Sequence, residues 1–249
     1  MTPIEATVVA VAGLCAGAIN TVVGSGTLIT FPVLLTLGYP PVVANASNSI
    51  GLVPGGITGA FGYRAELAGQ RTRIVRLGIC SLLGGAVGAL LLLVLPPGVF
   101  KAVVPVLIII ALILVVAQPW LARRLSERER HEHGGTLAML AAFGAGIYGG
   151  YFGAAQGVLL VGMLGILMTE GIQRLNALKN VLTAGVNLVA GLVFVLIATV
   201  AWPVVLLIAI GSTAGGILGA KVGRRLPPAV LRGVIVVVGL VAVVKLLTD

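Results

Sequence analysis

Apolar residues fill this chain in long continuous runs. Runs such as 103–117, 178–200 and 204–218 approach or reach the roughly 20 residues that an α-helix needs to cross a bilayer. Strands of a transmembrane barrel would instead alternate polar and apolar residues with a period of two. The pattern therefore predicts an all-α polytopic membrane protein.

Composition agrees with this class. Hydrophobic residues make up 59% of the 249 residues and charged residues only 9%, with a mean hydropathy of +1.16. Soluble domains carry about 25% charged residues, so this chain has too few to form the polar surface of a water-soluble protein. Cys15 and Cys80 lie inside apolar runs without metal or redox spacing, and we expect small core residues there.

Basic residues gather between apolar runs, which orients the chain. The connections 38–41, 95–101 and 199–202 carry almost no charge and are expected outside, whereas the basic clusters are expected in the cytoplasm. The clusters are Arg64, Arg71, Arg73 and Arg76; Arg123, Arg124, Arg128 and Arg130; and Lys221, Arg224, Arg225 and Arg232. No basic stripe with interleaved aromatics is present, so the net charge of +9 does not indicate nucleic-acid binding. The N-terminus lacks a basic n-region and is read as a retained membrane segment.

Assigning each connection to the outside or the cytoplasm predicts six membrane spans, arranged in two halves. The predicted spans are 41–63, 77–95 and 102–118 in the first half, and 172–197, 203–223 and 228–247 in the second. The polar stretch 121–135 is expected to be a cytoplasmic linker between an N-terminal repeat, 1–120, and a C-terminal repeat, 136–249. Together the repeats would form one integrated membrane domain.

Two further apolar segments, 4–37 and 136–169, are each thirty-four residues long. A straight helix of that length would measure about 51 Å, too long for one crossing, and two crossings would need about 40 apolar residues. Glycines break each segment near its middle. We expect two re-entrant broken-helix hairpins, the first opening outside and the second opening to the cytoplasm.

The halves also resemble each other at a shift of 131 residues. Asn45 corresponds to Asn176, Ser49 to Asn180, and Gly26 to Gly157. Each half is then one hairpin plus three transmembrane helices, and the odd number of spans predicts two inverted repeats.

The hairpin tips are the first candidate binding residues. Glycines permit a tight reversal, Ser25 or Thr27 could N-cap the helix that follows, and helix N-termini favour anions. The candidates are Asn20, Gly24, Ser25, Gly26 and Thr27 in the first tip, and Tyr148, Tyr151, Gln156 and Gly157 in the second. The alternative is structural: the glycines allow close helix packing and the hydroxyls bond to backbone.

Polar side chains on the spans behind the hairpins are the second set. They are Asn45, Asn48 and Ser49 in the first half, and Asn176, Lys179, Asn180, Thr183 and Asn187 in the second. Amide and ionisable groups inside a bundle are candidates for function. The alternative for Lys179 is that it snorkels to the cytoplasmic interface.

Enzymatic and proton-coupled functions fit less well. No acidic residue falls inside a predicted span, so a relay of buried carboxylates is not expected. His131 and His133 lie in the linker outside any HExxH motif, and Gly24–Ser25–Gly26 is not a GxSxG turn. A Ser25–Lys179 dyad is the remaining catalytic alternative. We expect no enzyme, no cofactor and no metal site.

The run Gly-x-x-Asn-x-x-x-Gly-x-Gly-x-Leu-Ile-x-x-Pro at 17–32, followed by Ala-Asn-Ala-Ser-Asn-Ser at 44–49, resembles the sulfite exporter TauE/SafE family, also called the toluene sulfonate uptake permease family. The second-half counterparts are 146–157 and 176–180. Members often have a denser glycine cluster at the first tip, where this chain has Ser25 and Thr27 between glycines.

The resemblance implies a prokaryotic inner-membrane transporter, most simply an exporter of sulfite or organosulfonates. Its expected partners are a small anionic substrate and the lipid bilayer, with no nucleic acid and with a homodimer left open. An anion channel or a non-transporting membrane scaffold is the alternative.

Overall fold

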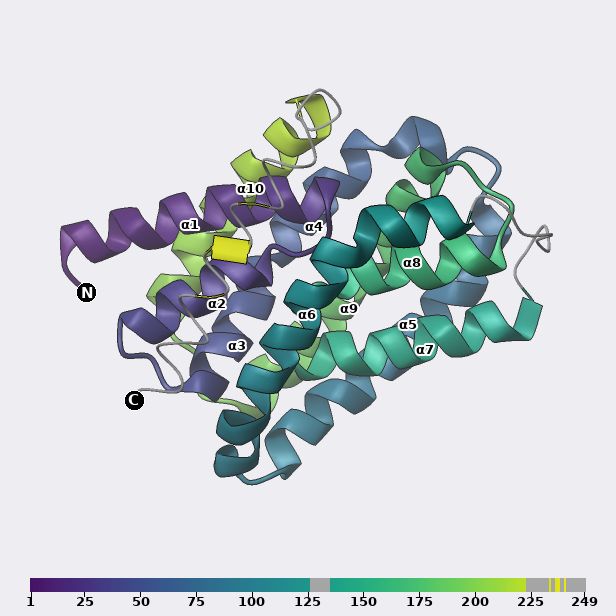
Figure 1. Ribbon diagram of the computed structural model, residues 1–249. Coiled ribbons are helices and arrows are strands. Elements are labelled where there is room, and N and C mark those ends of the chain that lie inside the picture. Colours follow the sequence, from purple (N-terminus) through teal and green to yellow (C-terminus); the bar gives the residue numbers. More distant parts are fainter. Residues whose placement is uncertain (126–134, 223–232, 234–235, 238–239, 241–249) are drawn as a thin grey trace.

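The computed structural model describes residues 1–125 and 135–222, with 233, 236, 237 and 240 (Figure 1). Its described residues fold as helices joined by short connections. The helices are α1 (Pro3–Val22), α2 (Thr27–Thr36), α3 (Pro41–Gly51), α4 (Val53–Gly62), α5 (Arg71–Val94), α6 (Pro97–Leu125), α7 (Gly135–Tyr151), α8 (Gln156–Leu167), α9 (Ile172–Ile197) and α10 (Trp202–Val222), with a short 3₁₀ helix, η1 (Arg64–Leu67).

Five of the described helices are long and apolar enough to cross a membrane: α1, α5, α9, α10 and residues Gly98–Ala117 of α6. Large hydrophobic side chains cover their outer faces, among them Val11, Leu83, Ile113 and Leu206. Such an apolar surface is unfavourable in water and is typical of a surface that contacts lipid. The protein is therefore an integral membrane protein.

Both predicted hairpin segments contain a long helix, a break and a short apolar helix. The breaks fall at 23–26 and 152–155. Their backbone is left-handed at Gly24 (φ +90°), Gly153 (φ +77°) and Ala155 (φ +57°). With 10 and 12 residues, α2 and α8 are only about 15 and 18 Å long, too short to cross alone.

The predicted single span 41–63 is wrong in one respect, because the structure divides it into α3 and α4 at Leu52. Pro54 lacks a backbone N–H and its ring disfavours a continuous helix. The hydroxyl of Ser212 in α10 donates to the carbonyl of Gly51 at 2.8 Å, beside the break. The counterpart span in the second half is the uninterrupted α9, as predicted.

Some helix boundaries also differ from the prediction. α5 begins at Arg71 instead of Leu77, and α6 continues to Leu125, so the first residues of the predicted linker are helical. Hydropathy marks where a helix leaves the membrane, and charged residues can extend that helix further. Residues 126–134 of the linker and most of the predicted span 228–247 lie outside the described residues.

Two pairs of parallel helices frame the molecule, α1 beside α10 and α5 beside α7 (Figure 1). Glycines lie where the backbones meet: a Cβ on Gly17 would come within 2.3 Å of the Ser212 carbonyl oxygen, and one on Gly88 within 2.0 Å of the Ile147 carbonyl oxygen. Small residues let membrane helices approach closely, so packing replaces the hydrophobic drive available in water.

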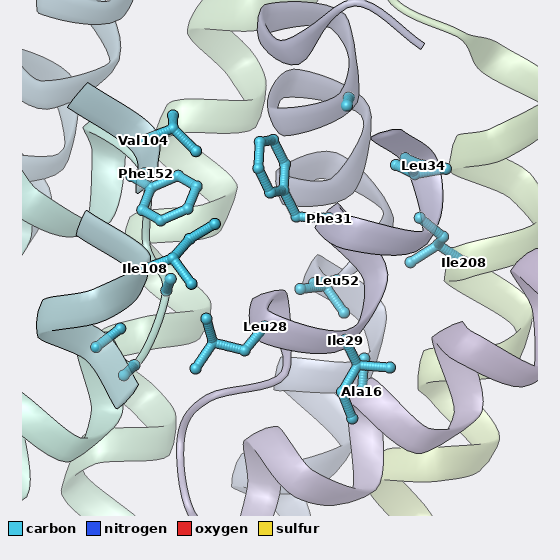
Figure 2. Packing of buried hydrophobic residues seen from close by; sticks show 14 of the residues in the cluster. Ala16, Leu28, Ile29, Phe31, Leu34, Leu52, Val104, Ile108, Phe152 and Ile208 are labelled. Carbon is cyan, nitrogen blue, oxygen red and sulfur yellow. The ribbon is translucent and has the colours of Figure 1, made fainter. Parts of the chain in front are cut away.

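The core joins elements of both halves. Figure 2 shows Phe31 of α2 and Phe152 of the second break pointing toward one another, with Val104 and Ile108 of α6 beside Phe152. The two rings meet edge to face with centroids 5.2 Å apart, and Phe100 lies within 6.3 Å of Phe31 and 6.0 Å of Phe152. This packing fixes the second break against α2.

Candidate functional site

The first break touches the first turn of α8. The amide of Gly157 donates a hydrogen bond to the carbonyl of Gly24 at 3.0 Å. A Cβ on either glycine would lie 2.5 Å from the Cα of the other, so only glycine fits at both positions. The predicted tips therefore form one junction.

Side chains of α9 cap the end of α1 beside this junction. Lys179 Nζ donates to the carbonyls of Asn20 at 2.8 Å and Thr21 at 3.2 Å. The amides of Asn176 and Asn180 also donate to the Thr21 carbonyl, at 3.3 and 3.2 Å. The last carbonyls of a helix have no partner within it and carry its negative dipole end, which explains three donors gathered there.

This arrangement decides between the two readings of Lys179. Its side chain has 0% exposure, the lowest of any charged residue among those described. The snorkelling alternative is therefore wrong, because the amine reaches inward to α1 instead of outward to the interface.

A reciprocal cap holds the end of α7. Asn45 of α3 donates from Nδ2 to the Tyr151 carbonyl at 3.0 Å. Asn45 and Asn176 are the pair related by 131 residues; Asn45 caps α7 and Asn176 caps α1, so each caps a helix of the other half.

Asn48 acts within the first half. Its Nδ2 donates to Thr27 Oγ1 at 3.3 Å, and its Oδ1 accepts a hydrogen bond from the Thr30 hydroxyl. The predicted N-cap by Ser25 or Thr27 is wrong: Gly26 occupies the N-cap of α2, without a side-chain bond. The Thr27 hydroxyl instead accepts a hydrogen bond from Asn48 of α3.

Three of the predicted site residues have a buried polar atom without a hydrogen-bond partner: Ser25 Oγ, Asn45 Oδ1 and Gln156 Nε2. Ser25 is 1% exposed and Gln156 3%. Ser25 follows Gly24 and Gln156 precedes Gly157, so both lie next to the contact. An unsatisfied buried polar group costs about 1–3 kcal/mol, so their retention favours a ligand that completes these bonds.

The other candidates serve the protein's own backbone or pack. Thr183 donates to the Lys179 carbonyl at 2.9 Å, one turn earlier in α9, and Tyr148 donates to the Ala154 carbonyl inside the second break. Ser49 is buried, while half-buried Tyr151 places its ring edge to face against Phe100, at 5.5 Å. These four residues support the site more than they line it.

Several contributors escaped prediction. The backbone carbonyls of Asn20 and Thr21 accept hydrogen bonds from side chains of α9. A backbone acceptor cannot be predicted from the pattern of side chains. Thr30 stands three residues after Thr27, and this helical spacing could have indicated it. The left-handed Ala155 and the cluster of Phe31, Phe100 and Phe152 carried no usable signal.

An ion-pair cluster lies apart from the tips, where α9 begins. Glu170 accepts hydrogen bonds from Arg73 of α5 and, at 2.6 Å, from Arg174 Nε. Burial by itself raises the pKa of the Glu170 carboxyl, but hydrogen bonds and charge from Arg73 and Arg174 outweigh it and hold the pKa below its usual value. Arg174 also donates to the Ala68 carbonyl, so the cluster joins the connection before α5 to the connection before α9.

Comparison with known proteins identifies the family. The sequence profile described as "Sulfite exporter TauE/SafE" matches residues 9–246. The chain belongs to the TauE/SafE family. It is therefore a membrane transporter of that family.

Relatives of this TauE/SafE chain agree. It is 27% identical over 240 residues to the probable membrane transporter protein YfcA of Escherichia coli (strain K12), covering 95% of this chain and 87% of that protein. It is 26% identical to a probable membrane transporter protein of Haemophilus influenzae, covering 95% and 92%, and 26% identical to ORF9 of Sinorhizobium sp, covering 96% and 91%. No solved structure shows significant similarity.

Proposed function

We propose that the protein exports small sulfur-containing oxyanions, such as sulfite or organosulfonates, and binds them between the two hairpin tips. One observation carries the proposal: Ser25 Oγ and Gln156 Nε2 are buried and without partners, on residues that are next in sequence to the hydrogen-bonded Gly24 and Gly157. Both groups can donate to the oxygens of an anion.

The surroundings suit negative charge. α2 and α8 begin at the junction, and the N-terminal end of a helix carries partial positive charge. Lys179 also places its amine at the end of α1, beside the junction, where the Asn20 and Thr21 carbonyls accept its hydrogen bonds. An arriving anion could draw this amine away from the carbonyls, while Asn176 and Asn180 continue to cap Thr21.

The transport path would follow two inverted repeats with re-entrant hairpins. Parallel packing of α1 with α10 and of α7 with α5, and the reciprocal caps by Asn45 and Asn176, support this reading. The beginning of α7 and the end of α8 line one groove through Leu137 and Leu167, as expected of a hairpin that returns to its side of entry.

Movement of the tips would open the site to either side. The Gly24–Gly157 hydrogen bond closes the junction, so an anion would have to separate the first break from the start of α8 to reach both Ser25 and Gln156. Export needs no buried carboxylate, because an inside-negative potential favours anion exit by about 2.3 kcal/mol per charge per 100 mV. The bacterial relatives support a prokaryotic inner membrane as the location.

Flux in proteoliposomes tests the proposal. Purified full-length protein is reconstituted and assayed with labelled sulfite, sulfoacetate and other sulfonates, beside chloride and phosphate. We expect saturable flux of sulfur oxyanions that Ser25→Ala reduces at least tenfold. Ser81→Ala is the matched control, because Ser81 Oγ is also buried and unpaired but lies on α5, against α7.

The outcomes separate the alternatives. Absence of flux for every anion, from protein that remains folded, would end the proposal. Equal losses in Ser25→Ala and Ser81→Ala would remove the tips as the site. Flux without saturation or response to trans substrate would indicate a channel.

A further inference from the structure

A polar cavity of about 180 Å³ opens between the N-terminal ends of α5 and α7, away from the hairpin tips. It is lined by Thr72, Arg73, Arg76 and Leu77 of α5 and by Gly135, Thr136 and Met139 of α7. None of these residues takes part in the proposed transport site.

The cavity offers positive charge and hydroxyls together. Arg73 is engaged by Glu170, which Arg174 also holds. Arg76 is exposed, and no ion pair involves it within the described part of the chain. Thr72 and Thr136 are exposed hydroxyl donors from the two walls, and α7 begins here with its positive dipole end. This donor set fits a group with several anionic oxygens, such as a phosphate.

An apolar groove of about 440 Å³ lies on the adjoining side of α7. Its lining is Leu137, Leu140 and Ala141 of α7 and Met163, Ile166 and Leu167 of α8. Successive residues of a helix are about 100° apart, so Thr136 and Leu140 fall on neighbouring strips of the same two turns. The polar cavity and the groove therefore adjoin along the first turns of α7.

The position along the helix matches the structure of a lipid. The stretch of α7 from Thr136 to Ala141 extends about 8 Å, or about one and a half turns. Arg71, Arg73 and Arg76 put this end of the bundle at the cytoplasmic surface by the positive-inside rule. A phosphate at the surface and the upper part of an acyl chain below it would span the cavity and the groove.

We propose that this is a binding site for an anionic phospholipid of the cytoplasmic leaflet. Its phosphate would lie against Arg76, Thr72 and Thr136, and one acyl chain would occupy the groove between α7 and α8. A zwitterionic lipid carries a compensating amine and gains less from Arg76, and a soluble anion leaves the groove unused.

Lipid binding to the full-length protein tests this site. Protein delipidated in neutral detergent is titrated with phosphatidylglycerol, phosphatidylcholine or inorganic phosphate, while native mass spectrometry follows retained lipid and a melting curve follows stability. We expect phosphatidylglycerol to half-saturate at a concentration about fivefold or more below phosphatidylcholine, the effect of one cation near an anionic lipid.

Matched variants locate the binding. Arg76→Gln should weaken phosphatidylglycerol binding about fivefold, whereas Arg64→Gln, an exposed arginine outside both cavities, should leave it nearly unchanged. Leu140→Ser should weaken it more than Leu83→Ser, since Leu140 and Leu83 are 61% and 59% exposed but only Leu140 lines the groove.

Three results would overturn the proposal. They are equal affinity for the two lipids, equal losses in Arg64→Gln and Arg76→Gln, or stabilisation by phosphate alone with no difference between Leu140→Ser and Leu83→Ser. The last would indicate a soluble anion as the occupant. Anion flux through the tips is a separate measurement, so either proposal can fail alone.

Discussion

Gly157 in the first turn of α8 donates its backbone N–H to the carbonyl of Gly24 at 3.0 Å, which joins the first break to a helix from the other half of the chain. Neither residue has a side chain, and neither position has room for one. The polar groups next to this contact, Ser25 and Gln156, are left with unpaired atoms. This contact between the two halves therefore lies next to two residues that a ligand could supply with hydrogen-bond partners.

Alanine at the junction should be costly in two separable ways. Gly24→Ala combines a left-handed backbone, φ +90°, with a 2.5 Å approach to Gly157 Cα, whereas Gly38→Ala has φ +83° and no atom within 4 Å. We expect about 1–2 kcal/mol for the backbone strain at Gly38 and about 1–3 kcal/mol more for overpacking at Gly24. Thermal unfolding in detergent measures both, and equal losses would mean that the tips do not touch.

Lys179 should matter more for transport than for stability. Lys179→Gln leaves the Asn20 carbonyl with a weaker donor but removes a buried cation, and these effects on folding oppose each other. We expect little change in the unfolding midpoint and at least a tenfold loss of anion flux. Lys221→Gln, at the exposed end of α10, is the control. Unchanged flux in Lys179→Gln would show that this charge does not select the anion.

Lowering the pH should remove the contribution of the Glu170 ion pairs to the stability of the fold. Because Arg73 and Arg174 hold the pKa of Glu170 below its usual value, the carboxylate stabilises the fold at pH above the unfolded pKa, about 4.3, and this contribution disappears as pH falls through the folded pKa. Glu170→Gln should lower stability by about 1–3 kcal/mol at pH 7. The wild-type and variant unfolding curves should converge on acidification, and a constant gap down to pH 3 would contradict this account.

The two arginines of that cluster should differ. The side chain of Arg73 is 9% exposed and that of Arg174 is 35% exposed. Screening by solvent weakens the second pair, so Arg73→Gln should destabilise the protein more than Arg174→Gln. Melting curves at low and high salt measure this, and only the Arg174 contribution should shrink clearly with salt.

Two serines related by 131 residues give a test of the α3–α4 break. Ser212 Oγ donates to the Gly51 carbonyl at 2.8 Å, whereas Ser81 Oγ has no partner. Ser212→Ala should cost about 1 kcal/mol, and Ser81→Ala should be neutral or slightly stabilising. Equal effects on the unfolding midpoint would mean that Ser212 does not support the break.

Local sequence predicted the helices well, because each apolar run must satisfy its own backbone in lipid. The bounds predicted for α9 match the structure, and both hairpin segments break where glycines interrupt them. The break at Leu52 was missed, although Pro54 was visible, because proline in a membrane helix is often tolerated. The hydrogen-bond partners of Asn45 and Asn48 could not be predicted from the sequence. The Asn45 amide donates to Tyr151 in the other half of the chain, whereas the Asn48 amide donates to Thr27 in its own half.

By itself the sequence determined the membrane class, most of the described helices and the positions of the two glycine-rich breaks, because hydrophobic length and glycine breaks act locally on the chain. Only the tertiary structure decided that the tips touch, that Lys179 points inward, and that Ser25 and Gln156 keep unpaired atoms. Those facts depend on partners more than a hundred residues away. The packing of α8 and α9 against the end of α1 brings such partners within hydrogen-bond distance.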